Sequence, residues 1–218
     1  MNKHFTILIL FILVSASAIA QNKPFWNDIQ KFKRQDSLSM PPKKGIVFVG
    51  SSSFTMWKAL ENHYKDYNAI NRGFGGSTLT DAIEYAEEIV LAYKPRQVVI
   101  YSGENDIANG ASADETFSRF KTLFDKLRKG LPKAKITYIS MKQSPSREKF
   151  AAELVKANGM IRDYIQTQKK ANYIDVNAKM LGSDGKPRPE LFLNDMLHMQ
   201  QAGYDIWIKE ITPHLKKK

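Results

Sequence analysis

Cysteine is absent from all 218 residues, and its absence removes several classes of site. The chain can form no disulfide, no cysteine-ligated metal site and no lipid-modified cysteine anchor. Histidine is scarce as well, with four in the chain, and none belongs to a His-Glu-x-x-His zinc motif. The sequence therefore predicts an activity that needs neither a catalytic metal nor a cofactor.

Long hydrophobic runs are also missing. The mostly apolar stretch Phe5 to Val14 is well short of the roughly 20 residues that cross a bilayer. Lys3 precedes it, and small residues ending in Ala18-Ile19-Ala20 follow, which is typical of a secretory signal peptide rather than a membrane anchor. We expect residues 1–20 to be removed after Ala20, giving a secreted or periplasmic protein without a lasting membrane anchor. The remaining 198 residues suffice for one domain.

Acidic residues are outnumbered by basic ones, 22 to 33, giving a net charge of +11. Such a balance can favour nucleic acid, anionic polysaccharide or a membrane surface. No nucleic-acid-binding motif accompanies it, and most of the charges fall on helix faces that are typical of solvated surface. We expect no nucleic-acid partner. The sequence does not indicate an oligomeric state.

Apolar runs that alternate with amphipathic stretches indicate the fold class. Residues 45–50, 68–71, 97–102, 135–141 and 172–176 are typical of buried strands, and residues 54–62, 79–93, 112–131 and 144–165 of helices. Continuously apolar strands separated by helices predict a parallel sheet covered on both faces. Residues 21–44 form a lead-in segment with a short amphipathic helix, and residues 45–218 form one α/β domain.

Small and polar residues follow the first three predicted strands. They are Gly50-Ser51-Ser52-Ser53, Asn71 to Ser77 and Gly103-Glu104-Asn105-Asp106. In a parallel sheet these segments reach the same edge, where ligands bind. The serines alone are also typical of a polar turn that caps a helix, and the glycine-rich turn, which lacks the pattern of a phosphate loop, could be purely structural. Asp195 and His198, three residues apart, could form an acid–base pair or cap the last helix.

Together these motifs resemble the SGNH (GDSL-type) hydrolases in the branch with Gly-Ser-Ser-Ser. The resemblance rests on Gly50-Ser51-Ser52 followed by Trp57, Asn71-x-Gly73-x-x-Gly76, Gly103-Glu104-Asn105-Asp106 and Asp195-x-x-His198, and it extends from Ile46 to Tyr204. It implies a three-layer α/β/α sandwich of the flavodoxin type with a mostly parallel five-stranded sheet. It also implies that Ser52 is the nucleophile, His198 the base and Asp195 its support. The oxyanion donors would be Ser52, Gly76 and Asn105.

The expected function is hydrolysis of small acyl esters, in particular acetyl groups on carbohydrate. A lipid-directed lysophospholipase or thioesterase and a non-catalytic glycan-binding module are the alternatives. We expect Glu104 and Asp106 to fix their loop through hydrogen bonds. Arg147 could contact substrate or pair with a carboxylate, and Phe74 could form a wall for the acyl or alcohol group.

Overall fold

The computed structural model describes residues 23–217, so the predicted signal peptide lies outside the described residues. Between residues 23 and 217, no helix is both long and apolar enough to cross a membrane.

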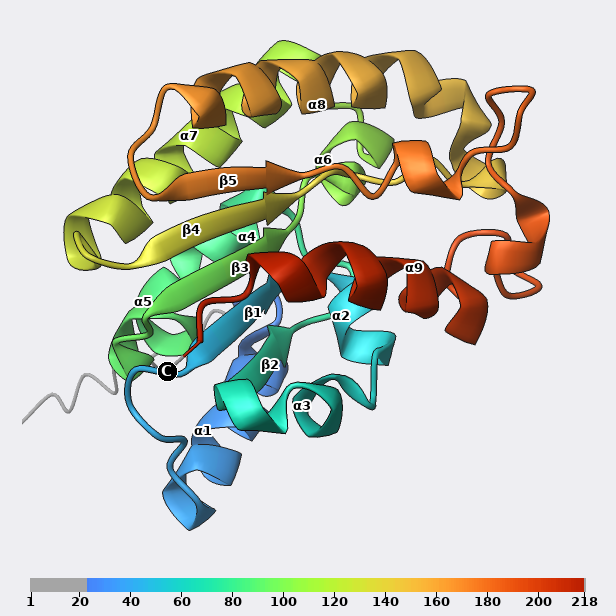
Figure 1. The fold of residues 1–218 in the computed structure, drawn as a ribbon. Coiled ribbons are helices and arrows are strands. Elements are labelled where there is room, and N and C mark those ends of the chain that lie inside the picture. The colour runs from blue at the N-terminus through green and yellow to red at the C-terminus, as the bar shows by residue number, and fades with distance from the viewer. Residues whose placement is uncertain (1–22, 218) are drawn as a thin grey trace, which may run out of the picture.

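Five parallel strands form the central sheet (Figure 1). They are β1 (Ile46–Gly50), β2 (Ala69–Gly73), β3 (Gln97–Tyr101), β4 (Lys135–Ile139) and β5 (Ala171–Ile174). Their order is β2-β1-β3-β4-β5, so the strand order reverses around β1. Ligand crevices in such sheets form at the carboxyl ends of the strands next to this reversal. The predicted parallel five-stranded α/β sandwich is confirmed.

Helices cover both faces of the sheet and form two cores. One core involves α1 (Trp26–Leu38), α4 (Leu79–Glu84), α5 (Ala86–Ile89), α7 (Ala113–Gly130) and α8 (Ala151–Gln166). The other involves α2 (Ser52–Met56), α3 (Leu60–His63) and α9 (Gln201–Ile211). Alternate residues of β1 supply the two cores, with Val47 on the first side and Phe48 on the second. A short helix, α6 (Glu104–Ala108), follows β3.

The predicted continuous helix over residues 54–62 is wrong. Helix α2 ends at Met56 and α3 begins at Leu60, because the chain turns to place Trp57 in the core. The indole of Trp57 is buried and packs against Tyr204 and Trp207 of α9, with ring centroids 5.1 and 6.2 Å apart. Tertiary packing of one aromatic side chain therefore overrides the local helical pattern.

Two further predicted helices are interrupted. The stretch 79–93 breaks at Tyr85 and at Val90, both of which are buried in the first core. The helix expected from Ser144 begins instead as a 3-10 helix, Pro145–Phe150, in which Arg147 departs from helical geometry (φ −118°, ψ 21°). Regular α-helix begins only at Ala151. Breaks of this kind depend on tertiary contacts that the hydrophobic period does not encode.

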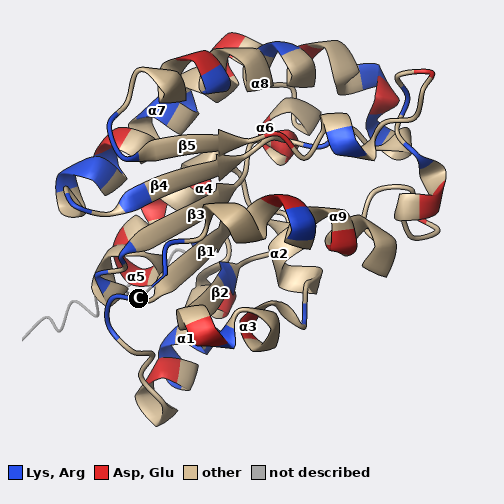
Figure 2. Ribbon diagram, viewed as in Figure 1, with Lys and Arg blue, Asp and Glu red and all other residues tan. Residues whose placement is uncertain are grey.

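Charged residues of both signs are interspersed along the outer faces of the helices (Figure 2). Many are exposed ion pairs, such as Lys121 with Asp125 at 2.9 Å and Lys156 with Asp114 at 2.6 Å. Exposed pairs of this kind add little to stability. The distribution agrees with the prediction that most of the charge lies on solvated helix faces.

Candidate active site

Ser52 lies at the carboxyl end of β1, as the first residue of α2. The chain leaves the sheet at Gly50, where a Cβ would lie 2.0 Å from the carbonyl oxygen of Tyr101, so only glycine fits. The first N–H groups of a helix have no intrahelical partner. The Ser52 N–H is accordingly bonded to no other residue in the described part of the chain. The carbonyl of the next residue, Ser53, accepts a 2.9 Å hydrogen bond from the Tyr204 hydroxyl of α9.

His198 approaches Ser52 from the loop that precedes α9. Its Nε2 lies 3.0 Å from the Ser52 hydroxyl oxygen, and its Nδ1 lies 2.6 Å from a carboxylate oxygen of Asp195. The other carboxylate oxygen accepts the backbone N–H groups of Leu197 and His198, each at 2.9 Å. Three side chains from two distant segments thus form one chain of hydrogen bonds.

The bond to His198, the largest influence on Asp195, holds the pKa of this carboxyl down to about 2. The two backbone N–H groups act in the same direction, whereas the slight burial of Asp195 opposes them. Asp195 is therefore ionised throughout the neutral range and keeps a negative charge beside Nδ1 of the imidazole. A histidine held in this way presents Nε2 as a proton acceptor toward Ser52.

The loop carrying His198 is held by hydrogen bonds within the loop and by others from the segment after β4. The N–H of Leu193 donates to the carbonyl of His198 at 2.7 Å, and Met196 adopts a left-handed conformation (φ 53°) at the tip. Ser146, in the segment after β4, donates both its backbone N–H (3.1 Å) and its hydroxyl (2.9 Å) to the Met196 carbonyl. The sequence patterns did not identify Ser146 as part of the site.

Gly76 occupies the turn after β2 in a left-handed conformation (φ 83°). This conformation favours glycine. The turn is fastened to the end of β1, because the Phe74 N–H and the Ser77 hydroxyl both donate to the Gly50 carbonyl, at 2.9 and 3.4 Å. Within the described chain, the N–H of Gly76 is bonded to no other residue. It is therefore available to a ligand.

Asn105 stands in the first turn of α6 with its side-chain amide held at both ends. Its nitrogen donates to the Ser77 carbonyl at 3.0 Å, and its oxygen accepts a 2.9 Å hydrogen bond from the Arg147 guanidinium. A primary amide carries two N–H groups, so one remains for a ligand. The bond from Arg147 also fixes which end of the amide is the nitrogen.

A buried charge cluster supports this arrangement. Glu104 is bound by Lys142 at 3.0 Å, by Arg147 at 3.0 Å and by the Tyr101 hydroxyl. Burial alone would raise the pKa of the Glu104 carboxyl, but the positive charges of Lys142 and Arg147 offset this effect and hold that pKa below its ordinary value. Glu104 thus fixes its loop as expected. The sequence patterns did not identify Lys142, although it follows β4 at the same sheet edge.

Asp106 connects the loop after β3 to the segment that follows β2. One of its carboxylate oxygens accepts the Leu79 N–H at the start of α4, and the other accepts from Arg119 of α7, each at 2.9 Å. Its side chain is fully buried, and this burial raises the pKa of the carboxyl despite both bonds. The role is structural, as expected.

Phe74 does not form the wall that the sequence suggested. Its ring is fully buried and packs against Phe25 and Tyr85, with centroids 5.4 and 6.3 Å apart. The turn directs this side chain into the core because the lead-in segment supplies an aromatic partner there. Arg147, the other candidate for substrate contact, places its guanidinium on Glu104 and Asn105.

Metal ligands are not gathered at this edge. Among residues 23–217, no group of three or more His, Cys, Asp or Glu side chains could hold a metal ion. What the edge does assemble is a hydroxyl within reach of a histidine, with unbonded N–H groups of Ser52 and Gly76 and an amide N–H of Asn105 nearby. A hydroxyl next to a histidine, accompanied by such donors, has the parts that acyl transfer requires.

Comparison with solved structures finds the same fold in bacterial proteins. A candidate acylhydrolase from Bacteroides fragilis is 24% identical, with a TM-score of 0.76 over 87% of this chain and 96% of that one. A GDSL-like lipase from Bacteroides thetaiotaomicron is 22% identical, with a TM-score of 0.75 over 86% and 96%. An acetyl xylan esterase from Geobacillus stearothermophilus is 15% identical, with a TM-score of 0.63 over 81% and 96%. At these identities the likeness concerns the fold alone.

Sequence comparison identifies the family. No curated protein matches the chain. The sequence model of the GDSL-like Lipase/Acylhydrolase family, however, matches residues 46–206, from the first residue of β1 into α9. This range includes the serine, glycine, asparagine, aspartate and histidine described above. The chain therefore belongs to the GDSL-like lipase/acylhydrolase family.

Proposed function

We propose that this protein is a secreted serine esterase that hydrolyses small acyl esters, in particular acetyl esters on carbohydrate. The observation that carries the proposal is the relay from Asp195 through His198 to Ser52, with contacts of 2.6 and 3.0 Å. A serine hydroxyl is a weak nucleophile at neutral pH and requires an adjacent base. His198 is in position to serve as that base.

The reaction proceeds in two acyl transfers. His198 accepts the hydroxyl proton as the Ser52 oxygen attacks the ester carbonyl, and it then returns that proton to the departing alcohol. Water, deprotonated by the same histidine, hydrolyses the acyl-enzyme and releases the acid and free serine. Asp195 holds the imidazole in one orientation and stabilises its positive charge during both transfers.

The negative oxygen of each tetrahedral intermediate is bound by three donors. They are the N–H groups of Ser52 and Gly76 and the side-chain amide of Asn105. Because these donors are fixed before substrate binds, little reorganisation is needed during the reaction. Loss of one such donor typically lowers turnover by about 10²- to 10³-fold.

The carbohydrate part of the proposal rests on two considerations. The N-terminal sequence indicates export, which would expose the enzyme to polymeric substrates outside the cytoplasm. The acetyl xylan esterase of Geobacillus stearothermophilus has the same fold, and its name states its substrate. Both considerations motivate acetylated glycans as the first substrates to test.

The test uses a fluorophosphonate probe and p-nitrophenyl acetate with the chain lacking residues 1–20. We expect covalent labelling and release of nitrophenol, both lost in Ser52→Ala, with turnover reduced about 10⁴-fold or more. Ser51→Ala and Ser53→Ala are the matched controls and should keep labelling. If wild-type protein shows neither labelling nor turnover, the proposal is wrong. A steep preference for the decanoyl ester would instead favour a lipid substrate.

A further inference from the structure

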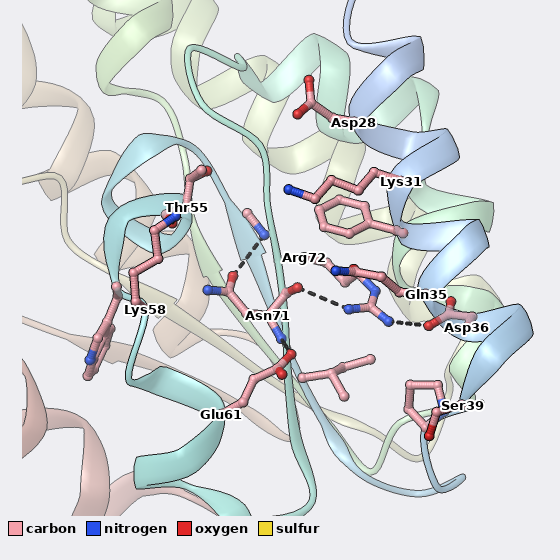
Figure 3. A pocket seen from close by; sticks show the side chains of 15 residues that line it. Asp28, Lys31, Gln35, Asp36, Ser39, Thr55, Lys58, Glu61, Asn71 and Arg72 are labelled. Carbon is pink, nitrogen blue, oxygen red and sulfur yellow. Dashed lines mark hydrogen bonds and ion pairs between the residues drawn. The ribbon is translucent and has the colours of Figure 1, made fainter.

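A polar cavity adjoins the candidate active site and has no part in the relay described above. It has a volume of about 520 Å³ and lies between α1 on one side and α2, α3 and the edge strand β2 on the other (Figure 3). We call it the α1 pocket, defined by Lys31, Gln35, Ser39, Thr55, Lys58 and Glu61. Its volume falls within the range of small-molecule sites.

The α1 pocket begins next to the nucleophile. Ser52 and Thr55 are three residues apart in α2 and therefore share a face of that helix. A Cβ built on Gly75 would lie 3.9 Å from the Cβ of Ser52 and 3.9 Å from the hydroxyl oxygen of Thr55. Gly75 has no side chain to fill the space between Ser52 and Thr55, and Thr55 lines the pocket.

Several polar groups in the α1 pocket are not used by the fold. Asp28, Lys31, Gln35 and Ser39 line it, are exposed to solvent, and form no side-chain hydrogen bond or ion pair with any other residue in the described range. In Figure 3 the Lys31 ammonium extends from α1 into the space facing Thr55. These groups include donors and acceptors, as a ligand rich in hydroxyl groups requires.

The charges of the cavity balance. Its lining includes three cationic and three anionic side chains, namely Lys31, Lys58 and Arg72 with Asp28, Asp36 and Glu61. Arg72 and Asp36 neutralise each other in a buried ion pair of 2.6 Å. An anionic ligand would gain little from such a wall, and an acyl chain would find few apolar groups among these charged side chains. A neutral polar ligand fits this lining best.

A peptide adding a strand to β2 is not the occupant. The outward N–H groups of β2 are already bonded, that of Asn71 to Glu61 at 2.7 Å and that of Gly73 to the Asn71 side chain at 2.9 Å. The carbonyl of Asn71 accepts from Arg72 at 3.0 Å. The backbone edge therefore offers few groups for strand pairing.

We propose that the α1 pocket binds neutral sugar units of an acylated oligosaccharide, on the alcohol side of the ester held at Ser52. This inference rests on the proposed function for the position of the ester. Most of one wall comes from α1, which precedes the residues matched by the family, 46–206. The pocket is thus a feature of this chain's lead-in segment added to the family domain.

The first test measures binding without catalysis. Xylotetraose, cellotetraose, mannotetraose and, as the anionic comparison, trigalacturonate are titrated calorimetrically into wild-type protein and into two pocket variants, Lys31→Ala and Gln35→Trp. Their matched controls are Lys33→Ala and Arg34→Trp, at exposed positions of α1 outside the pocket. We expect at least one sugar to bind, with Kd raised about tenfold in each pocket variant and unchanged in each control.

The second test measures kcat and KM for the acetylated form of the bound oligosaccharide and for p-nitrophenyl acetate. The pocket variants should lose about tenfold more kcat/KM on the oligosaccharide than on the aryl ester, mainly through KM. Three results would overturn the inference. They are absence of sugar binding, equal binding by pocket and control variants, and tighter binding of trigalacturonate than of the neutral sugars. If the protein has no esterase activity, the proposed function is wrong, but the binding test still shows whether the α1 pocket binds sugar.

Discussion

Replacing Arg147 by alanine should slow turnover without removing any group from the relay. Arg147 donates one hydrogen bond to the Asn105 amide oxygen at 2.9 Å and one to Glu104 at 3.0 Å. Without the guanidinium, the Asn105 side chain keeps a single bond, to the Ser77 carbonyl at 3.0 Å. The amide then has more freedom to rotate, and its free N–H no longer points in one direction.

The expected loss of turnover follows from the loosened position of one donor, the Asn105 amide. Complete loss of an oxyanion donor costs about 10²- to 10³-fold in turnover. Because the alanine variant retains Asn105 with one of its two bonds, we expect about 10- to 100-fold, or roughly 1.4–2.7 kcal/mol. The fold should persist, because Lys142 and Tyr101 still bind the buried Glu104. KM should change little.

The assay is a double-mutant cycle with Asn105→Ala, measured as kcat and KM on p-nitrophenyl acetate. If Arg147 acts by positioning Asn105, its replacement should cost little once Asn105 is already alanine. Arg147→Lys, which retains the charge but lacks the planar fork, should fall between wild type and Arg147→Ala. A rise in KM with unchanged kcat, or an equal loss in both backgrounds, would refute the reasoning and indicate substrate contact instead.

Three other predictions follow from single contacts. The carboxylate of Asp195 stabilises the fold above pH 3.8, its ordinary pKa, and this contribution is lost as pH falls through about 2. His198→Ala removes the main cause of the lowered pKa, so it should raise the titration midpoint of Asp195 measured by carboxyl NMR. An unmoved midpoint would contradict that cause. Gly103→Ala introduces a Cβ 2.8 Å from a methionine sulfur at φ 118°, so urea unfolding should show a loss of about 1–3 kcal/mol. Tyr204→Phe removes the hydrogen bond to Ser53, and the same measurement should show a loss of about 0.5–1.5 kcal/mol, whereas equal stability would mean that water replaces the hydroxyl.

The residues at the strand ends were predictable because topology alone brings them together. Parallel strands place Gly50, Gly73 and Tyr101 at one edge, so the segments that follow must meet there. The position of a residue at that edge does not fix the direction of its side chain. Phe74 illustrates this limit, since its ring enters the core through contact with Phe25, 49 positions earlier in the sequence.

Buried charge was the part of the site least visible in the sequence. Lys142 directly follows the predicted strand 135–141, where a lysine is typical of a solvated strand end. Its burial, with 2% of the side chain exposed, is stable only because Glu104 reaches it from another strand end. For Arg147 the sequence likewise left two alternatives, contact with substrate or pairing with a carboxylate, because it does not show which charged groups come together. Which carboxylate or amide it binds depends on the 3-10 segment Pro145–Phe150 that precedes α8, which the helical period does not reveal.

Phe25, in the lead-in segment, packs beside the turn that bears the proposed oxyanion donor Gly76. The ring lies 3.8 Å from the position of a Cβ on Gly76, and the segment around it is held by long-range bonds, such as that from Tyr85 to the Pro24 carbonyl across 61 positions. Its partners, Phe74 and Tyr85, lie after β2 and at the break between α4 and α5, so the segment can dock only once these residues have come together. We expect the turn bearing Gly76 to reach its final form only after this segment docks. Recovery of activity on refolding should then lag behind formation of the sheet.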